Sequence, residues 1–189
     1  GKFTVYNTLC AISVLLNLGF DIDEITKATK DVQWVKGRCE IVPTPKNITV
    51  IIDYAHTPDG LKNILSAVRE ISTGRIIIVF GCGGDRDKLK RPEMGRIAGE
   101  LSNIAVVTSD NPRNENPLLI INDILCGMEK SKARIAVIEN RRQAVEFALS
   151  KAKKGDVVLL AGKGHETYQI IGDTKFPFDE REIIKEYFN

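Results

Sequence analysis

Short apolar runs alternate with amphipathic stretches from residue 47 onward, and this alternation constrains the fold more than any other feature of the chain. Runs such as 75–81 (RIIIVFG) and 156–162 (DVVLLAG) are almost continuously apolar. Strands that are buried on both faces have this composition, and they are typical of parallel sheets covered by helices. The repeated order of strand and helix therefore predicts an α/β domain that is doubly wound and Rossmann-like, with a mostly parallel sheet.

The same patterns place the individual elements. Thr57 and Pro58 form a start signal for one helix, and Asp179 caps the last one. Residues 167–178 are expected to form a hairpin that turns at Gly172-Asp173. We expect strands at 47–54, 75–81, 103–109, 134–140 and 156–162, and helices at 57–72, 91–102, 117–131, 141–155 and 179–188.

The first 37 residues have a different pattern of apolar residues. Apolar residues recur there at three- and four-residue spacing as far as Gly19, which indicates a helix. Residues 21–32 predict a second, shorter helix with Asp21 or Asp23 as its cap. Gly37 and two prolines then break the pattern. We therefore expect a helical segment over 1–37 and a separate α/β domain over 38–189.

Charge and hydropathy exclude several classes of partner. The chain has 189 residues and a net charge of +2, from 27 basic and 25 acidic residues. A net charge this small provides no strong electrostatic attraction for nucleic acid or an anionic membrane. No apolar run approaches the ~20 residues that a membrane span needs, and no signal peptide is visible, so we expect a cytoplasmic protein. Because the chain starts at Gly1 rather than Met, we expect a piece of a longer protein.

Cysteine and histidine usage gives no sign of a metal site. Cys10, Cys39, Cys82 and Cys126 form no CxxC motif, and we predict that they are small core residues in a reducing compartment. Two histidines are too few for a histidine-rich site.

Unusual polar residues follow four of the expected strands. In an open parallel sheet, ligands bind outside the carboxyl ends of the strands, so these segments should share one rim. None of these segments matches a nucleotide-binding motif. GCGGD is not a GxGxxG motif, AGKGHE is not a Walker A loop, and no Walker A motif occurs in the chain. The glycines after the strands could therefore simply form tight turns. The segments are 53–60 (DYAHTPDG), 81–92 (GCGGDRDKLKRP), 110–117 (DNPRNENP) and 162–168 (GKGHETY).

The segment DNPR is the most informative of the four. Asp, Asn and Pro favour turns, so a plain turn is one interpretation. Arg113 makes that interpretation less sufficient, because a guanidinium held beside a proline suits bidentate capture of a carboxylate.

Six ordered motifs carry a family resemblance: VYN, GRCE, DYAHTPDGL, GCGGDRDKLKRPEMG, SDNPRNENP and AGKGHETYQ, which together span residues 5 to 169. They resemble the C-terminal part of the Mur ligases, in particular the branch that adds the third amino acid of the peptidoglycan stem peptide. Two positions depart from the family pattern: Lys36 replaces a common proline before GR, and Leu89 replaces a frequent glycine. Neither position belongs to the ligand-binding groups.

The resemblance implies an ATP- and Mg²⁺-dependent amide ligation. In the family, the D-glutamate carboxylate of UDP-N-acetylmuramoyl-L-alanyl-D-glutamate becomes an acyl phosphate, and the amine of the incoming amino acid attacks it. A central domain holds the phosphate-binding loop, the magnesium ligands and a carbamylated lysine. Residues 1–37 resemble the tail of that domain, and 38–189 resemble the final, amino-acid-binding domain. The chain would then contain no catalytic residue or metal ligand of its own and would be inactive alone.

The resemblance also implies site residues. In the family, DNPR marks enzymes that add meso-diaminopimelate, whose far carboxylate Arg113 would bind. Arg91 would bind the carboxylate beside the reacting amine, and Glu166 would accept from an ammonium. The full substrate set is Arg91, Asp110, Asn111, Pro112, Arg113, Gly162 and Glu166, and the ATP set is Asn7, Arg38, Asp53 and His56.

Two alternatives stay open at this stage. One is a lysine-adding or other Mur-type ligase, against which DNPR argues. The other is a non-catalytic, Rossmann-like ligand-binding module, which the missing Walker A motif favours for the chain taken alone.

Overall fold

The computed structural model describes residues 2–32, 35–45 and 47–189. Contacts between residues divide the chain into two compact units, Gly1–Val35 and Lys36–Asn189, which are described separately below. Lys36 and Gly37 thus belong to the second unit.

The first unit contains two helices, as the spacing of apolar residues predicts. Helix α1 spans Lys2–Asn17 and helix α2 spans Ile22–Asp31, with Gly19 in the turn between them. Asp21 caps α2 by accepting a hydrogen bond from the amide of Asp23. Several large apolar side chains of α1 are exposed, namely Val5, Tyr6, Leu9, Val14 and Leu16.

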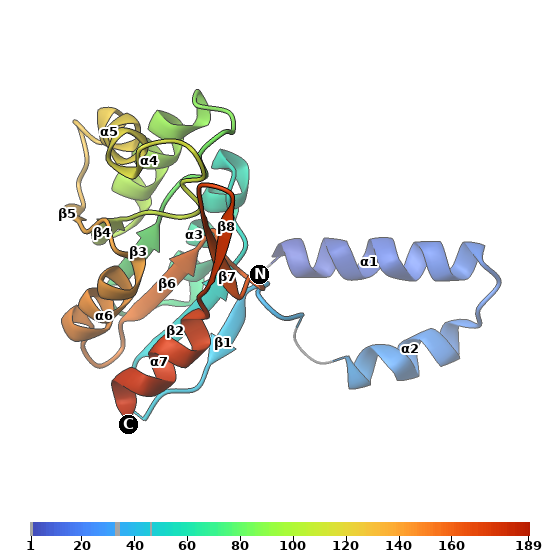
Figure 1. The fold of residues 1–189 in the computed structure, drawn as a ribbon. Helices are drawn as coiled ribbons and strands as arrows, with labels where there is room; N and C mark the ends of the chain where they lie inside the picture. Colours follow the sequence, from blue (N-terminus) through green and yellow to red (C-terminus); the bar gives the residue numbers. More distant parts are fainter. Residues whose placement is uncertain (1, 33–34, 46) are drawn as a thin grey trace. The chain divides into compact units, whose positions relative to one another are not determined.

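A six-stranded sheet forms the centre of the second unit, in the order β1-β2-β6-β3-β4-β5 (Figure 1). Neighbouring strands from β2 to β5 are parallel, which confirms the predicted doubly wound, mostly parallel fold. Strand β1 is the antiparallel exception, and the sequence pattern missed it because it is only three residues long and lies beside two prolines. The strands are Glu40–Val42, Thr49–Asp53, Ile76–Phe80, Ile104–Val107, Arg134–Val137 and Val157–Ala161 for β1 to β6.

Helices cover both faces of this sheet (Figure 1). Helices α6 (Arg141–Lys151) and α7 (Glu180–Phe188) pack together on one face and share a core with the strands. On the opposite face, α4 (Lys90–Leu101) contacts both α3 (Pro58–Ile71) and α5 (Pro117–Cys126). The predicted caps Thr57 and Asp179 are confirmed by their side-chain hydrogen bonds to Gly60 N and Arg181 N.

Burial separates the central strands from the edge. Every residue of β3 and β6 is buried, as the apolar runs predict. Strand β5 contradicts the expectation that all strands are buried on both faces, because it is the sheet edge and three of its four residues are exposed. It also ends at Val137 rather than at residue 140, since Asn140 already caps α6.

The prediction that all four cysteines are core residues is wrong for two of them. Cys82 is buried and Cys39 is half-buried, whereas Cys10 and Cys126 are exposed. The latter two lie on solvent-facing positions of α1 and α5, where an apolar sequence neighbourhood does not bring burial.

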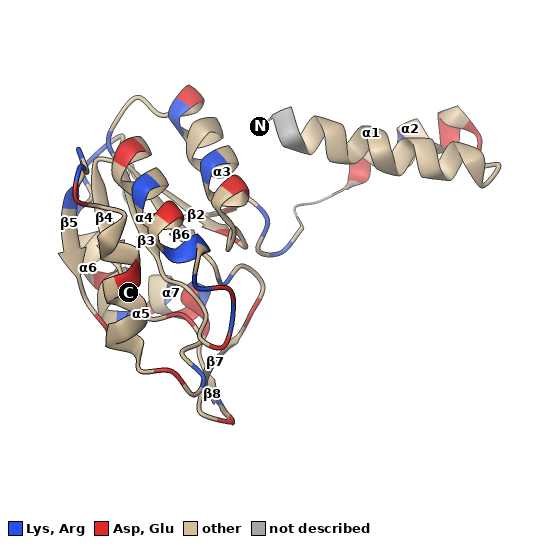
Figure 2. Ribbon diagram, turned by 90° about the horizontal axis from the view of Figure 1, so that it is seen from above, with Lys and Arg blue, Asp and Glu red and all other residues tan. Residues whose placement is uncertain are grey.

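The hairpin is confirmed as a second, two-stranded sheet. Strands β7 (Tyr168–Ile171) and β8 (Thr174–Pro177) are antiparallel, with Ile171 opposite Thr174 and the turn at residues 172 and 173. Basic and acidic residues are interspersed along the ribbon of the domain, as the small net charge leads one to expect (Figure 2). Among the described helices, none has the length and apolar character that crossing a bilayer requires.

Candidate functional site

The loops that follow β2, β3, β4 and β6 meet at the carboxyl rim of the sheet, as the topology requires. The segment after β4 is unusually buried for a loop: Thr108, Ser109, Asp110 and Asn111 are each at most 9% exposed. Polar side chains that are buried in this way must have partners, so the partners describe the site.

Close backbone contact explains the glycines after β3. The amide of Gly84 donates to the carbonyl of Asn111 at 2.9 Å. A Cβ atom at Gly84 would collide with the carbonyl of Pro112, so only glycine allows the two loops to approach this closely. The glycines of GCGG therefore pack against the DNPR segment.

Arg113 is held in an uncommon backbone conformation. Its φ of 51° lies in the left-handed region, which a non-glycine residue seldom adopts. Two backbone hydrogen bonds attach it to the hairpin: Arg113 N donates to Ile170 O at 3.1 Å, and Gly172 N donates to Arg113 O at 2.8 Å. This attachment, together with Pro112, fixes the direction in which the side chain leaves the chain.

The guanidinium of Arg113 is only partly used. Its Nη1 donates to the carbonyl of Gly84 at 2.8 Å and, at 3.4 Å, to that of Asn111. Its Nε and Nη2 have no acceptor among the residues that the structure describes. A guanidinium anchored at one nitrogen with the rest of its fork unused is suited to bind an oxyanion.

A buried charge cluster lies beside Arg113. Lys163, whose side chain is 0% exposed, donates to Asn111 Oδ1 at 2.6 Å and lies 3.3 Å from Asp110 Oδ1. Asn111 Nδ2 donates to Glu166 Oε2 at 3.0 Å. Gly162 has a φ of 110°, and a Cβ atom there would lie 2.7 Å from Asp110 Oδ2. The structure therefore brings together Asp110, Asn111, Gly162 and Glu166.

Arg91 lies on the same rim but in a different environment. It is 1% exposed, and its guanidinium bonds Glu115 at 2.8 and 3.0 Å and Asp123 at 2.8 Å. A substrate carboxylate would have to displace one of these carboxylates, so the binding role of Arg91 stays a prediction that its surroundings do not favour.

Arg86 is a better-placed cation in the same loop, and the sequence motif did not single it out. It is exposed, and within the described part of the chain its guanidinium has one acceptor, the carbonyl of Asp85. A Cβ atom built on Gly83 would contact both Arg113 Nη1 and Arg86 Cγ, so the two arginines flank the same glycine.

Glu115 shows how strongly Arg91 is engaged. The hydrogen bond from Arg91 lowers the pKa of Glu115 to about 2, and the backbone amide of Asp85 adds to this effect. The Glu115 carboxylate is therefore ionised throughout the neutral range, and it anchors the loop after β3 to the loop after β4.

The predicted ATP residues divide between the two units. Arg38, Asp53 and His56 surround Tyr54, whose ring lies 4.7 Å from the Arg38 guanidinium and 4.7 Å from the His56 ring. His165 lies on Tyr54 as well, at 5.1 Å. Asn7 belongs to α1 in the first unit and is exposed. Tyr54 and His165 join this group through ring contacts that no spacing in the sequence encodes.

Asp53 is a structural anchor within this group. It is 8% exposed, and it accepts from the amides of Cys39 at 2.7 Å and Ala55 at 2.8 Å. Burial raises its pKa, while the two amide hydrogen bonds and Arg38 oppose the rise. Asp53 therefore ties the segment before β1 to the end of β2.

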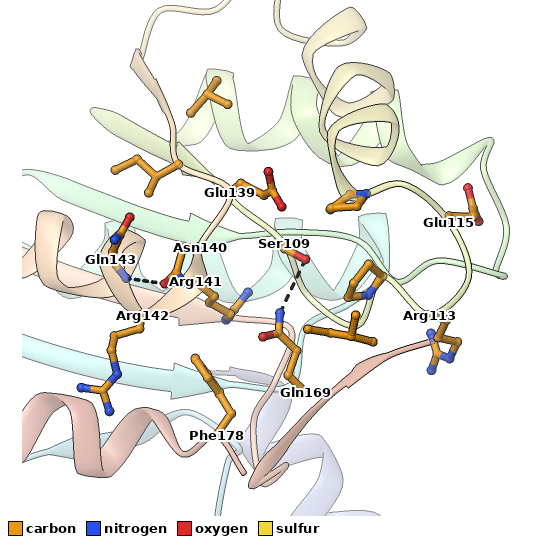
Figure 3. Close-up of a pocket in the computed structure, with 15 residues that line it drawn as sticks. Ser109, Arg113, Glu115, Glu139, Asn140, Arg141, Arg142, Gln143, Gln169 and Phe178 are labelled. Atoms are coloured by element: carbon orange, nitrogen blue, oxygen red, sulfur yellow. Dashed lines mark hydrogen bonds between the residues drawn. The ribbon is translucent and has the colours of Figure 1, made fainter. Parts of the chain in front are cut away.

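A cavity of about 770 Å³ lies next to the DNPR segment, between the hairpin and the start of α6 (Figure 3). Pro112 and Arg113 are the predicted site residues that line it. Inside, Gln169 Nε2 contacts Ser109 Oγ at 3.5 Å, and Asn140 accepts from Gln143 N at 3.1 Å. The buried guanidinium of Arg141 also lines the cavity and bonds Glu180 and the carbonyl of Ala161. The charge cluster and the cavity are thus neighbouring features, joined at Arg113.

No metal centre is built from the described part of the chain, where His, Cys, Asp and Glu side chains form no group of three that could hold an ion.

Comparison with known proteins identifies the family of the α/β domain. A model of the family described as "Mur ligase, glutamate ligase domain" matches residues 37–164. The chain belongs to the Mur ligase family. Mur ligases are ATP-dependent ligases, which agrees with the resemblance carried by the six motifs.

Two relatives are similar to this Mur ligase chain over nearly its whole length. The chain is 55% identical over 186 residues to the UDP-N-acetylmuramoyl-L-alanyl-D-glutamate–2,6-diaminopimelate ligase of Caldanaerobacter subterraneus subsp. tengcongensis, covering 98% of this chain and 38% of the relative. It is 52% identical over 189 residues to ligase 1 of that name from Clostridium acetobutylicum, covering 99% and 39%.

A solved structure of a ligase with the same name superimposes on the chain with a TM-score of 0.78 at 36% identity, covering 100% of this chain and 38% of the other. The chain therefore spans well under half the length of the relatives that it matches.

Proposed function

We propose that this chain is the amino-acid-binding, C-terminal part of a ligase that joins meso-diaminopimelate to UDP-N-acetylmuramoyl-L-alanyl-D-glutamate. Residues 38–189 would be the C-terminal domain, and 1–37 would be the helical end of a central ATPase domain. The names and the identity of the relatives support the reaction class. The missing central and N-terminal domains would supply the phosphate-binding loop and the magnesium ligands.

The observation that carries the proposal is that an incompletely paired guanidinium, Arg113, and an incompletely paired carboxylate, Glu166, both contact Asn111. Arg113 offers Nε and Nη2, while Glu166 Oε1 has no partner among the described residues. The far end of diaminopimelate carries one carboxylate and one ammonium, which are complementary to these two groups. L-lysine carries only the ammonium there, so Arg113 favours diaminopimelate over lysine.

The other residues receive supporting roles. Asp110 and Asn111 border the ammonium position, and Gly162 allows close approach because a side chain there would meet Asp110 Oδ2. Arg86 is the preferred partner for the carboxylate beside the reacting amine, since Arg91 is already paired. These groups bind and orient the amine, which must attack the activated D-glutamate carboxylate.

Arg38, Tyr54, His56 and His165 fit one side of a nucleotide, because aromatic rings in tilted contact, with a guanidinium beside them, suit a base. Asp53 would hold this group together, and Asn7 stays a predicted ATP residue of the first unit. ATP, when bound, would supply the phosphoryl group that activates the carboxylate. We assign the Mg²⁺ ligands to the central domain, as the family resemblance implies.

The test uses the full-length protein that contains this chain. Phosphate release should depend on the UDP-linked dipeptide and on meso-diaminopimelate, and L-lysine should support it at least tenfold less well. A preference for L-lysine would contradict the proposal.

The 189-residue chain alone provides a second test. It should release no phosphate from ATP above background, because backbone donors and the lysine of a phosphate-binding loop stabilise phosphoryl transfer. ATP-dependent ligation by this chain alone would contradict the proposal that another domain supplies the phosphate-binding loop.

A further inference from the structure

Lys163 is a fully buried charge at the rim and is not among the proposed ligand-binding residues. Its side chain is 0% exposed. Its Nζ donates to Asn111 Oδ1 at 2.6 Å, to the carbonyl of Tyr168 at 2.9 Å and to Glu166 Oε2 at 3.2 Å. An ammonium has three N–H donors, so these three acceptors use its full capacity. With no free donor and no solvent access, Lys163 cannot itself bind a ligand.

The three acceptors belong to two parts of the chain. Asn111 lies in the loop after β4, whereas Glu166 and Tyr168 lie, like Lys163 itself, on the stretch that leads from β6 into the hairpin. Lys163 therefore ties together the segments that form the proposed diaminopimelate site.

Lys163 also sets the orientation of the Asn111 amide. Asn111 Oδ1 accepts from Lys163 Nζ and, at 2.9 Å, from Ile170 N. Two donors face this atom, so it must be the oxygen, since an NH₂ group there would face two other donors. Nδ2 is then turned to Glu166 Oε2 at 3.0 Å, which leaves Glu166 Oε1 for a ligand.

Charge gives Lys163 a second effect on the same site. Asp110 and Glu166 carry two negative charges, and Lys163 lies 3.3 and 3.2 Å from them. The cluster therefore has a net charge of −1, which one ligand ammonium neutralises. Without Lys163 the charge would be −2, and the excess would repel a carboxylate that approaches Arg113.

We propose that Lys163 is a positioning residue that sets the selectivity of this site for a zwitterionic end group over a simple ammonium. It does so by fixing the Asn111 amide and by holding the cluster at one net negative charge. The selectivity part of this proposal rests on the proposed function, whereas the positioning part does not.

Kinetics of the full-length ligase test the selectivity. Lys163→Met should raise the KM for meso-diaminopimelate about tenfold to a hundredfold, as expected for losing hydrogen bonds to charged groups. The KM for ATP should change less than about twofold, and L-lysine should be affected less than diaminopimelate. Lys175→Met is the matched control, because Lys175 is exposed and only lies over the Tyr168 ring at 4.4 Å; its KM values should not change. An equal rise in all KM values would reduce Lys163 to a folding role and overturn the proposal.

A double-mutant cycle tests whether Lys163 acts through Asn111. Asn111→Ala alone should raise the same KM, and Lys163→Met/Asn111→Ala should be little worse than the more damaging single variant. Losses that multiply would show that the two residues act independently, which contradicts the proposal.

Side-chain NMR of the 189-residue chain tests the positioning without any enzyme assay. The Asn111 NH₂ protons should be dispersed and slow to exchange in the wild type, and averaged and fast in Lys163→Met. If Lys163→Met does not fold, Lys163→Gln serves instead and should give an intermediate result, because it keeps a donor but not the charge. Unchanged Asn111 signals in the folded variant would overturn the proposal. If the full-length wild type did not use meso-diaminopimelate as a substrate, the proposed function would be refuted. The NMR test of the positioning role of Lys163 would still be valid.

Discussion

Arg91 and Arg113 lie on the same rim of the sheet, and both are arginines beside a proline, yet the structure uses them differently. Arg91 is 1% exposed and bonds two carboxylates of its own chain, Glu115 and Asp123. Among the described residues, the Arg113 guanidinium bonds backbone carbonyls alone, through one nitrogen. The partners of the guanidinium, which are carboxylates of the chain for Arg91 and backbone carbonyls for Arg113, therefore separate a structural arginine from a candidate ligand-binding one.

The largest expected effect concerns the structural member of the pair. Arg91→Met should lower the free energy of unfolding by about 3 kcal/mol, the low end for breaking a buried ion pair, because Asp123 is partly exposed. This loss corresponds to a fall in melting temperature of roughly 6–12 °C, which calorimetry of the 189-residue chain would measure.

Arg86→Met is the control for that experiment. Arg86 is exposed and bonds only the carbonyl next to it, so the melting temperature should change by less than about 2 °C. If Arg91→Met were equally harmless, the contrast between the two arginines would fail.

The next effect concerns binding at Arg113. In the full-length ligase, Arg113→Ala should weaken binding of meso-diaminopimelate about tenfold to a hundredfold, because a charged hydrogen bond contributes about 1.5–3 kcal/mol. Arg113→Lys should restore little, since a point charge does not replace a fork. If Arg113→Lys bound meso-diaminopimelate as tightly as the wild type, charge alone would matter at this position.

A smaller effect separates the backbone of Arg113 from its side chain. Its φ of 51° costs a non-glycine residue about 1–2 kcal/mol. Arg113→Gly should therefore be more stable than Arg113→Ala by about 1 kcal/mol, while both variants bind diaminopimelate equally weakly. Urea unfolding measures the first difference, and equal stability of the two variants would show that the left-handed conformation is not retained.

The last effect is the acid dependence of the Arg91 cluster. The Glu115 pKa is lowered to about 2, so its contribution to stability is complete above its ordinary pKa of about 4.3 and is lost as the pH falls toward 2. Glu115→Gln should flatten the fall in stability over this range, which urea unfolding at several pH values would measure. An unchanged pH dependence would show that Arg91 does not hold the carboxylate in solution.

The fold was largely predictable because its signals are local. Continuous apolar runs mark β3 and β6, and the caps Thr57 and Asp179 mark helix starts where the structure has them. Strand β1 and the exposed edge β5 were missed or misjudged, since edge position and very short pairing depend on the assembled sheet.

The site was predictable in part for a related reason. Asp110, Asn111 and Glu166 come together as the shared rim predicts. The burial of Lys163 and the pairing of Arg91 with two carboxylates arise from contacts between segments 24 to 53 residues apart in the chain, and no spacing encodes these contacts. The sequence did not single out Arg86, because Arg86 becomes a candidate carboxylate-binding residue only once Arg91 is known to pair with Glu115 and Asp123.

The most direct test of the central claim is the specificity of the full-length ligase with and without Arg113. The measured quantity is the ratio of kcat/KM for meso-diaminopimelate to that for L-lysine, in the wild type and in Arg113→Ala. We predict that the ratio falls about tenfold to a hundredfold in the variant, because only diaminopimelate has a far carboxylate to lose. An unchanged ratio, with both substrates impaired equally, would show that Arg113 serves only the turn and would contradict the account.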